Sequence, residues 1–403
     1  KPELMARFDD WVTHPRLTLA AVEEFVADPD RAGSLLEGDF AVWTTSGTTG
    51  RRGVFVHDRV ALAVYDALTV TRARALGPMA LLRAARRGMR VAAVVATGGH
   101  HVSTSMLNLN RRRLGAFADR IRTFSVLAPL PRLVAELNAF DPAILVGYPS
   151  ALQLLAGEAA RGVLRIQPAA AIVGGEVLTA DGRAAIQRGF GVRVLDQYAA
   201  SEFHGIAFSC PLGRLHVNAD WVTLEPVERD LSPTPRDRAS HTVLLTNLAN
   251  RVQPIVRYDL GDSVTLHSAP CECSNPLPTL TVAGRRGDLL AFRSADGEVA
   301  VLPLALTSVI EKTEGVRRFQ AYQVADDELR LRLETEEGSA AEGTRALVPN
   351  RVRNFLASQG AVDVRVALDD GPPARDPMTQ KFRSIWDARG RSAPGAEEPG
   401  QGN

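Results

Sequence analysis

The sequence predicts an α/β protein in which a large N-terminal α/β domain with mostly parallel sheets is joined by a hinge to a small C-terminal α+β domain. From residue 41 to about 260, short apolar runs alternate with helical patterns, which is typical of a parallel sheet covered by helices. Beyond residue 288 the pattern changes to strand, helix, two strands, helix and strand. The length of 403 residues fits two to three domains of roughly 150 residues each.

The elements of the large domain follow from apolar runs and their periodicity. Residues 1–40 have a helical pattern, and a helix is expected at Val60–Leu76, where residues 60, 64 and 68 are apolar. Another helix is expected at Pro149–Arg161. The expected buried strands are Val91–Ala96, Ile144–Val146, Ala170–Val173, Val192–Leu195 and Val243–Leu248. Ligands of such sheets bind at the carboxyl ends of the strands.

The small domain is expected to begin after a Gly- and Arg-rich hinge. Its expected elements are Leu289–Phe292, Leu302–Lys312, Arg318–Val324, Glu328–Glu334, Thr344–Gln359 and Val362–Leu368. The predicted boundaries are therefore 1–283 for the large domain, 284–288 for the hinge and 289–389 for the small domain. Residues 390–403 are rich in Gly, Pro and Glu, which predicts a disordered tail.

Composition limits the partners and the location of the protein. The 47 basic and 46 acidic residues nearly cancel, so no nucleic-acid or anionic-membrane partner is expected. No apolar run approaches the roughly 18 residues of a membrane span. Three cysteines are too few, and odd in number, for a disulfide framework. The start Lys1-Pro2-Glu3 has no apolar segment of a signal peptide, so the expected location is cytoplasmic.

A loop rich in glycine and hydroxyl groups is the strongest local signal for chemistry. Its residues are Thr45, Ser46, Gly47, Thr48, Thr49, Gly50 and Arg51. Glycine allows a phosphate to approach the backbone, and N–H groups, hydroxyls and Arg can donate to its oxygens. A surface turn is the alternative. A Walker A loop is excluded because no Lys follows a Gly, and no Gly-x-Gly-x-x-Gly fingerprint occurs.

The loop resembles the phosphate-binding signature of the acyl-adenylate-forming superfamily, and other motifs of that superfamily follow in its order. The similar segments are Gly174-Gly175-Glu176, Tyr198-Ala199-Ala200-Ser201-Glu202, Arg257-Tyr258-Asp259-Leu260-Gly261-Asp262, Gly284-Arg285-Arg286-Gly287-Asp288 and a lysine near the C-terminus, Lys381. Within the superfamily the chain looks most similar to phenylacetate–CoA ligases. The reasons are the short phosphate-binding loop, the length of the chain, which is short for the superfamily, and the run Ser201-Glu202-Phe203-His204-Gly205 before Cys210 and His216.

The resemblance implies a role for each matching residue. The loop 46–52 holds the β- and γ-phosphates of ATP, the segment from Gly174 to Glu176 lies against the adenine, and Tyr198 and Ser201 belong to the third motif. Asp262 accepts from both ribose hydroxyls, and Arg285 faces the ribose or a phosphate.

Two more roles concern the charges of the reaction. The resemblance implies that Glu202 ligates Mg²⁺ and that Lys381 bridges the α-phosphate and the attacking carboxylate as a compact charge. Each of these residues also has an ordinary alternative. Glu202 could be a carboxylate at the start of a helix, and Asp262 could be a turn residue. Arg285 could form an ion pair at the hinge, and Lys381 could be a solvated lysine.

The chain also departs from the family pattern at three places. Arg51 stands where the family often has Lys, Ala199 replaces a usual Gly, and Gly287 replaces an acidic hinge residue. None of these changes removes a charged group from the expected site, so a catalytically active protein is expected.

The cysteines and one histidine form a second constellation. Cys210 precedes His216, and Cys271 and Cys273 follow about 60 residues later, an arrangement that can build a tetrahedral Cys₃His zinc site. Phenylacetate–CoA ligase relatives have a similar pattern. Structural zinc is therefore expected, because four protein ligands leave no open position; the alternative is buried thiols and a core histidine.

The carboxylic-acid pocket has weaker signals. His100 and Tyr148 follow expected strands, and His204 follows the Glu202 motif. Each of the three could contact the acid or serve the scaffold.

The resemblance implies an ATP- and Mg²⁺-dependent ligase that converts a carboxylic acid, aryl or arylacetic by resemblance, into acyl-AMP and then transfers the acyl group to a thiol. CoA is the first expected acceptor, and the phosphopantetheine arm of a carrier protein or a nitrogen nucleophile are alternatives. Whether the chain forms a homodimer stays open. A non-catalytic nucleotide-binding homologue and a zinc-stabilised scaffold are the rivals from other classes.

Overall fold

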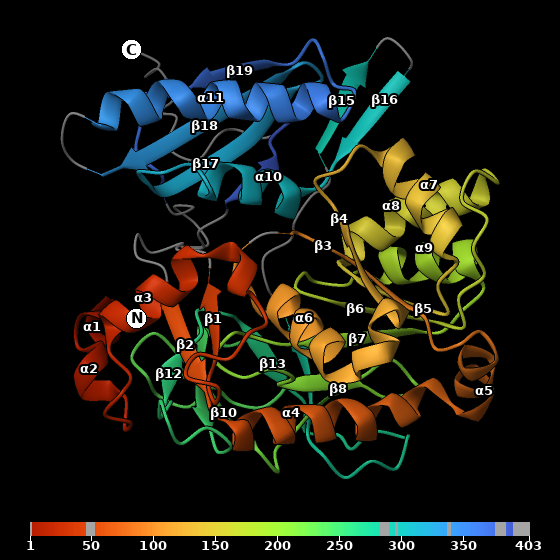
Figure 1. Ribbon diagram of the computed structural model, residues 1–403, viewed down its shortest axis with the longest axis vertical. Helices are drawn as coiled ribbons and strands as arrows, with labels where there is room; N and C mark the ends of the chain where they lie inside the picture. Colours follow the sequence, from red (N-terminus) through yellow and green to blue (C-terminus); the bar gives the residue numbers. More distant parts are fainter. Residues whose placement is uncertain are drawn as a thin grey trace, which may run out of the picture. The chain divides into compact units, whose positions relative to one another are not determined.

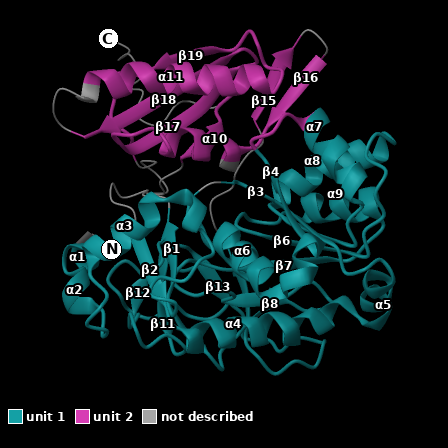
Figure 2. Cartoon of the chain, in the orientation of Figure 1, with its two compact units in different colours: residues 1–45, 53–126, 131–285 teal, residues 46–52, 127–130, 286–403 magenta. Residues whose placement is uncertain are grey.

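The computed structural model describes residues 2–45, 53–97, 99–282, 290–294, 297–336, 340–374 and 384–389. They form two compact units (Figure 2). The first lies within 1–45, 53–126 and 131–285, and the second holds 127–130 and the described part of 286–403. The expected hinge 284–288 and tail 390–403 lie outside the described residues. Within the described ranges, no helix is both long and apolar enough to cross a bilayer.

A nine-stranded mixed sheet is the centre of the first unit, in the order β13-β14-β9-β8-β7-β6-β5-β3-β4 (Figure 1). Its parallel half consists of β3 (Val91–Val95), β4 (Ile121–Ser125), β5 (Ile144–Gly147), β6 (Ala170–Gly174) and β7 (Val194–Tyr198). The antiparallel half consists of β8 (Ala207–Ser209), β9 (Leu215–Val217), β13 (Val264–Leu266) and β14 (Thr279–Val282). The parallel strands end at one edge of the sheet, where ligands of such sheets bind.

The helices of this unit begin where side chains can cap them. Thr18, Asp58 and Thr179 each accept a hydrogen bond from the backbone N–H three residues on, which satisfies a free donor of the first turn. The helices are α1 (Pro2–Ala6), α2 (Phe8–Trp11), α3 (Leu19–Ala27), α4 (Arg59–Arg72), α5 (Pro78–Arg86), α6 (Val102–Leu114), α7 (Leu130–Phe140), α8 (Pro149–Ala160) and α9 (Ala180–Phe190). Short 3₁₀ turns lie at η1 (Pro29–Arg31), η2 (Ala73–Leu76) and η3 (Gly115–Arg120).

Helices α8 and α9 lie side by side (Figure 1). Gly189 permits this packing, because a Cβ there would come within 2.6 Å of the Ala156 Cβ.

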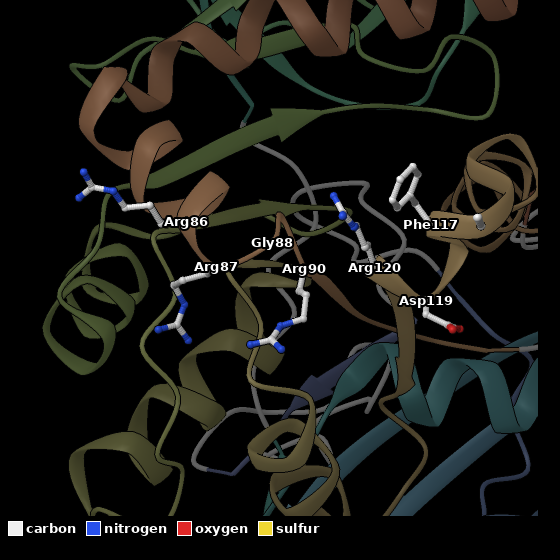
Figure 3. Close-up of a pocket in the computed structure, with 8 residues that line it drawn as sticks. Arg86, Arg87, Gly88, Arg90, Phe117, Asp119 and Arg120 are labelled. Carbon is white, nitrogen blue, oxygen red and sulfur yellow. The ribbon is translucent and has the colours of Figure 1, made fainter.

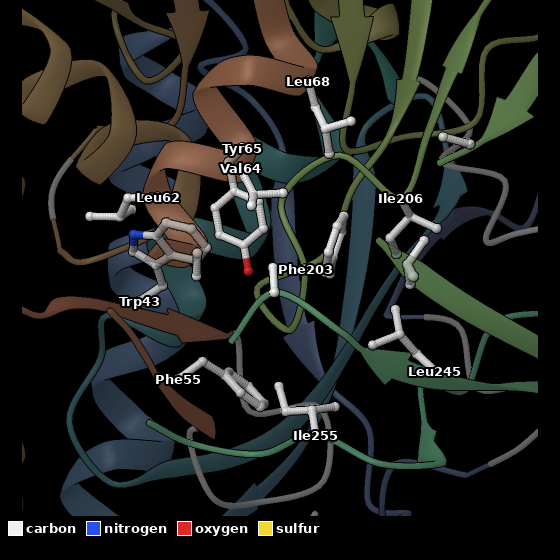
Figure 4. Packing of buried hydrophobic residues seen from close by; sticks show 14 of the residues in the cluster. Trp43, Phe55, Leu62, Val64, Tyr65, Leu68, Phe203, Ile206, Leu245 and Ile255 are labelled. Carbon is white, nitrogen blue, oxygen red and sulfur yellow. The ribbon is translucent and has the colours of Figure 1, made fainter. Parts of the chain in front are cut away.

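Two small antiparallel sheets complete the first unit. One pairs β1 (Ala41–Thr45) with β2 (Gly53–His57), and the other contains β10 (Val222–Val227), β11 (Thr242–Asn247) and β12 (Tyr258–Asp259). A buried cluster packs these sheets against α4 and includes the labelled residues of Figure 4: Trp43, Phe55, Leu62, Val64, Tyr65, Leu68, Phe203, Ile206, Leu245 and Ile255. The core therefore joins β1 and β2 to the segment that follows β7.

The second unit is an α+β fold. Strands β15 (Leu290–Ser294) and β16 (Gly297–Val301) pair antiparallel. The other elements are α10 (Pro303–Glu311), β17 (Val316–Ala325), β18 (Glu328–Thr335), α11 (Ala340–Ser358), β19 (Arg365–Leu368) and β20 (Ile385–Asp387). The last four strands form a sheet in the order β19-β18-β17-β20.

The structure confirms the predicted fold class and refines the elements. The expected strand Val243–Leu248 is present as β11, but it belongs to an antiparallel sheet apart from the parallel strands. The helical pattern of residues 1–40 holds three helices and a 3₁₀ turn rather than continuous helix. Strand β4 and the antiparallel half of the main sheet are not among the expected strands. The residues of β4, Ile-Arg-Thr-Phe-Ser, contain no continuous apolar run, and the antiparallel strands of three or four residues are too short to show a periodic pattern.

Candidate active site

A cavity of about 710 Å³ lies in the first unit and brings together residues from separate motifs of the sequence. Four predicted nucleotide-site residues line it, namely Gly175, Glu176, Tyr198 and Asp262. Gly175 and Glu176 follow β6, and Tyr198 ends the neighbouring strand β7. The cavity is therefore at the carboxyl edge of the parallel strands, where the topology predicts a ligand.

Tyr198 and Asp262 form a direct pair across this cavity. The Tyr198 hydroxyl donates to Asp262 Oδ2 over 2.8 Å. Burial raises the pKa of Tyr198 well above its usual range, and the negative charges of Asp262 and Glu202 raise it further. The phenol thus remains a donor, and its hydrogen bond holds the Asp262 carboxylate in place at the cavity.

Gly174 is the last residue of β6, and Gly175 and Glu176 form the bend that follows it. Gly175 has φ +83°, and a Cβ at this position would come within 3.1 Å of the Tyr148 ring. Both the backbone conformation and the close ring therefore require glycine. Tyr148 itself follows β5, and its hydroxyl accepts from the Ala96 N–H over 3.2 Å.

Glu176 is a buried carboxyl group with one engaged oxygen. Its Oε2 accepts from the Ser150 backbone N–H in the first turn of α8 over 3.0 Å, and burial raises its pKa. The other oxygen, Oε1, has no hydrogen-bond partner in the described part of the chain.

Ser201 and Glu202 lie buried in a turn after β7. Ala200 and Phe203 exchange backbone hydrogen bonds of 3.2 Å across this turn. Glu202 accepts a hydrogen bond from the Tyr258 side chain, and burial together with that carboxylate raises the pKa of Tyr258. The turn brings the Glu202 carboxylate close enough to Tyr198 that its negative charge contributes to the raised pKa of that phenol.

The other predicted residues have different surroundings. Thr45 ends β1, and its hydroxyl accepts from the Gly53 N–H over 3.2 Å. His100 packs on Phe25, with ring centroids 5.1 Å apart, and its Nε2 donates to the Asp28 carbonyl over 2.9 Å. These contacts tie His100 to the N-terminal helices. Ser46, Gly47, Thr48, Thr49, Gly50, Arg51, Arg285 and Lys381 lie outside the described residues.

The cavity also contains residues that the motifs did not indicate. Asp196 lines it together with Arg183, Arg214, His267 and Thr281. Burial raises the pKa of Asp196 to about 6, although the nearby Arg183 opposes the shift. The signal for Asp196 was its position two residues before Tyr198, since residues i and i+2 of a strand share a face.

The four predicted zinc ligands come together in the first unit. The candidate ligand atoms of Cys210, His216, Cys271 and Cys273 all lie within 4.8 Å of one another. The Sγ atoms of Cys210 and Cys271 are 3.9 Å apart, and Cys273 Sγ lies 3.4 Å from His216 Nε2. Tetrahedral Zn–S bonds of about 2.3 Å place two sulfurs roughly 3.8 Å apart, so the cluster has the size of a zinc site.

The tautomer of His216 also suits a metal ligand. Its Nδ1 donates to the Leu277 carbonyl over 2.9 Å, which leaves Nε2 as the lone-pair nitrogen facing the thiols. Metal-binding histidines commonly have such a second partner, which orients the ring.

Another cavity, of about 570 Å³, is lined by arginines near the starts of β3 and β4 (Figure 3). Arg87 and Arg90 both form ion pairs with Asp141, and Arg86 points away from them (Figure 3). The cavity lies at the opposite ends of these strands from the motif residues and contains none of the predicted site residues. It is therefore not the candidate nucleotide site.

Comparison with known proteins gives a fold-level result. No protein-family model and no curated protein matches the chain. A solved 2-hydroxyisobutyryl-CoA ligase in complex with 2-HIB-AMP and CoA is 22% identical, with a TM-score of 0.53 over 95% of this chain and 82% of that chain. A malonyl-CoA ligase with methylmalonyl-CoA and AMP is 17% identical, with a TM-score of 0.43 over 82% of this chain and 71% of that one. The anthranilate CoA ligase AuaEII with anthranoyl-AMP is 14% identical, with a TM-score of 0.41 over 85% and 65%.

Of these three structures, only the first supports a conclusion about the fold of this chain, because it alone of the three has a TM-score above 0.5. Its fold is the one that the motif series predicted from the sequence. The chain has the fold of 2-hydroxyisobutyryl-CoA ligase, an acyl-CoA ligase of known structure.

Proposed function

We propose that this protein is an acid–thiol ligase that uses ATP and Mg²⁺ to convert a carboxylic acid into acyl-AMP and pyrophosphate, and then transfers the acyl group to a thiol. The single observation that carries the proposal is the cavity in which Glu176, Tyr198 and Asp262 meet. These residues come from three motifs that resemble those of adenylate-forming enzymes, and they meet within a fold shared with an acyl-CoA ligase.

In the proposed first step, a carboxylate oxygen attacks the α-phosphorus of ATP, and the bond to the β-phosphate oxygen breaks to release pyrophosphate. Asp262 accepts from the ribose hydroxyls, and the turn from Gly174 to Glu176 lies against the adenine. Lys381 is the proposed cation between the two reacting anions. Alignment and neutralised charge lower the barrier for two partners that repel each other.

Glu202 is the proposed ligand of Mg²⁺, because a buried carboxylate near the nucleotide cavity suits a hard cation. The ion would neutralise phosphate charge. Cys210, His216, Cys271 and Cys273 are the proposed ligands of structural zinc, and the size of the cluster and the orientation of His216 support this.

For the acid, we propose an aryl or arylacetic class, with His204 and Tyr148 as contacts. His204 Nδ1 is buried without a partner among the described residues, and its ring lies 6.0 Å from Trp43 and 6.2 Å from Tyr65 between centroids. A ligand with a hydrogen-bonding group would satisfy that nitrogen, as an acceptor if Nδ1 carries the proton and as a donor if it does not. His100 is a weaker candidate, because Phe25 and Asp28 already hold its ring.

The test is pyrophosphate release from ATP and Mg²⁺ with aryl, arylacetic and short hydroxy or fatty acids. Hydroxylamine is included to capture the adenylate, so that turnover needs no natural acceptor. Release with one acid class, followed by thioester formation on addition of CoA, is the expected result. Silence with every acid, although ATP raises the melting temperature, would contradict adenylation and favour a nucleotide-binding homologue.

Lys381→Ala is expected to reduce pyrophosphate release by about 10²- to 10³-fold, the range for removing one electrostatic donor to a transition state. Affinity for ATP should change little, because the proposed role is confined to the reacting groups. Lys381→Arg keeps the charge and should retain more activity. Lys312→Ala, at the only other internal lysine, is the matched control and should behave like wild type; equal rates for Lys381→Ala and Lys312→Ala would remove Lys381 from the mechanism.

A further inference from the structure

A buried chain of hydrogen bonds connects β2, α4 and β11 with the turn that contains Ser201 and Glu202. We propose that His57, Tyr65 and Asn247 are positioning residues, which hold the backbone of this turn so that the Glu202 carboxylate is presented to a divalent cation. The inference rests on the proposed function, since it assigns a purpose to three residues outside every recognised motif. None of the three lines the nucleotide cavity.

The first link joins β2 to the turn. His57 Nε2 lies 2.9 Å from the Ser201 carbonyl oxygen, and the Tyr65 hydroxyl lies 3.0 Å from His57 Nδ1. A carbonyl can only accept, so Nε2 carries the proton and Nδ1 accepts from the Tyr65 hydroxyl. Both ring nitrogens are thereby satisfied in one neutral tautomer.

The second link comes from β11. Asn247 Nδ2 donates to the Tyr65 hydroxyl over 3.1 Å and to the Glu202 carbonyl over 2.9 Å. Its Oδ1 accepts from the backbone N–H groups of Ala249 and Asn250 over 2.9 and 3.0 Å. The amide is therefore fixed in orientation, and the carbonyls of two consecutive residues, Ser201 and Glu202, are held from different elements.

Burial makes this network rigid. His57 is fully buried, and burial lowers its pKa to about 3, so the imidazole adds no positive charge near the turn. The Trp43 ring lies on His57 with centroids 4.0 Å apart, and Phe203 meets Tyr65 edge-on at 5.1 Å. Figure 4 shows Tyr65 among Trp43, Phe55 and Phe203. Since buried polar groups that lose a partner are costly, the turn has one favoured backbone geometry.

The consequence concerns Glu202. Its own side chain is hydrogen-bonded to Tyr258, and its backbone carbonyl is held by Asn247. A glutamate whose side chain and backbone carbonyl are both held by hydrogen bonds needs little rearrangement to bind a cation. Some groups orient a metal ligand by hydrogen bonds without touching the metal themselves. Removing such a group typically lowers the metal affinity by about 10- to 100-fold.

The test is Tyr65→Phe, which keeps the ring and removes only the hydroxyl. His57 Nδ1 and one N–H of Asn247 then lose their partner. The half-saturating Mg²⁺ concentration for pyrophosphate release should rise about 10-fold, while ATP binding measured without Mg²⁺ stays unchanged. Val64→Ala, on the same helix and in the same core cluster, is the matched control for a loss of stability.

Two substitutions of His57 test the same role, because one keeps its hydrogen bonds and the other removes them. His57→Gln can still donate to the Ser201 carbonyl and accept from Tyr65, so it should keep most of the Mg²⁺ affinity. His57→Leu can do neither and should resemble Tyr65→Phe. If Tyr65→Phe and Val64→Ala shift the Mg²⁺ dependence equally, or neither shifts it, the positioning role is wrong.

A second measurement distinguishes failure of the proposed function from failure of the positioning role. If wild type releases no pyrophosphate with any acid, the same variants are compared by the extra thermal stabilisation that Mg²⁺ adds to ATP, which requires no turnover. Loss of that increment in Tyr65→Phe but not in Val64→Ala supports the positioning role. An unchanged increment in Tyr65→Phe overturns it.

Discussion

Replacing Asp262 with Ala is expected to lower kcat/KM for ATP by about 10³-fold. As the proposed acceptor of two ribose hydroxyls, the carboxylate contributes two charge-assisted hydrogen bonds, each worth about 1.5–3 kcal/mol. The sum of roughly 3–6 kcal/mol corresponds to about 10²- to 10⁴-fold at 1.4 kcal/mol per factor of ten. The substitution also leaves the Tyr198 hydroxyl, which donates to Asp262 over 2.8 Å, without its partner.

Two variants separate ribose binding from damage to the loop. Tyr198→Phe removes the buttressing hydroxyl but leaves the carboxylate, so its effect should be a small fraction of that of Asp262→Ala. Asp259→Asn weakens the same turn, since Asp259 Oδ1 accepts from the Gly261 N–H over 2.9 Å, yet Asp259 does not line the cavity. ATP affinity is measured by calorimetry and kcat/KM by pyrophosphate release. An Asp262→Ala protein no weaker than Asp259→Asn would show that the carboxylate does not contact the nucleotide.

Four of the five parallel strands could be predicted because their signals are local, whereas β4 was not among the expected strands. Strands β3, β5 and β6 begin at the expected residues, and β7 begins two residues later than expected. Their carboxyl ends then place Tyr148, Glu176 and Tyr198 at one edge of the sheet by topology alone. The pairing of Tyr198 with Asp262 follows from contact between residues 64 positions apart, and only motif order pointed to it.

Other parts of the site could not be derived from sequence patterns. His57, Tyr65 and Asn247 belong to no motif, and His57 is 144 residues from its partner Ser201. A single buried histidine in an apolar strand gives no indication of what it contacts. Asp196 is likewise outside every motif, and its place on the same face of β7 as Tyr198 becomes meaningful only when the cavity beside both residues is known.

Removing the zinc that we propose is expected to have the largest effect on stability. The cluster joins Cys210 and His216, on either side of the β8–β9 turn, to Cys271 and Cys273 in the segment before β14. Strand β14 pairs with both β9 and β13, so the metal would hold together the antiparallel end of the main sheet. Zinc supplies about 10 kcal/mol or more to small zinc domains. A loss of even about 4 kcal/mol would lower the melting temperature by roughly 10 °C.

The measurement combines elemental analysis with thermal unfolding of the full chain. Wild type should carry about one zinc per chain, as expected for one four-ligand site, and lose it together with thermal stability on prolonged chelation. The double variant Cys271→Ser and Cys273→Ser should be purified without stoichiometric zinc and melt near the temperature of the chelated protein. Glu272→Gln, an exposed residue between the two cysteines, is the control that should keep both properties. Stoichiometric zinc in the double variant would place the metal elsewhere. Wild type that is free of zinc yet equally stable with and without added metal would mean that the three thiols and His216 pack together without an ion.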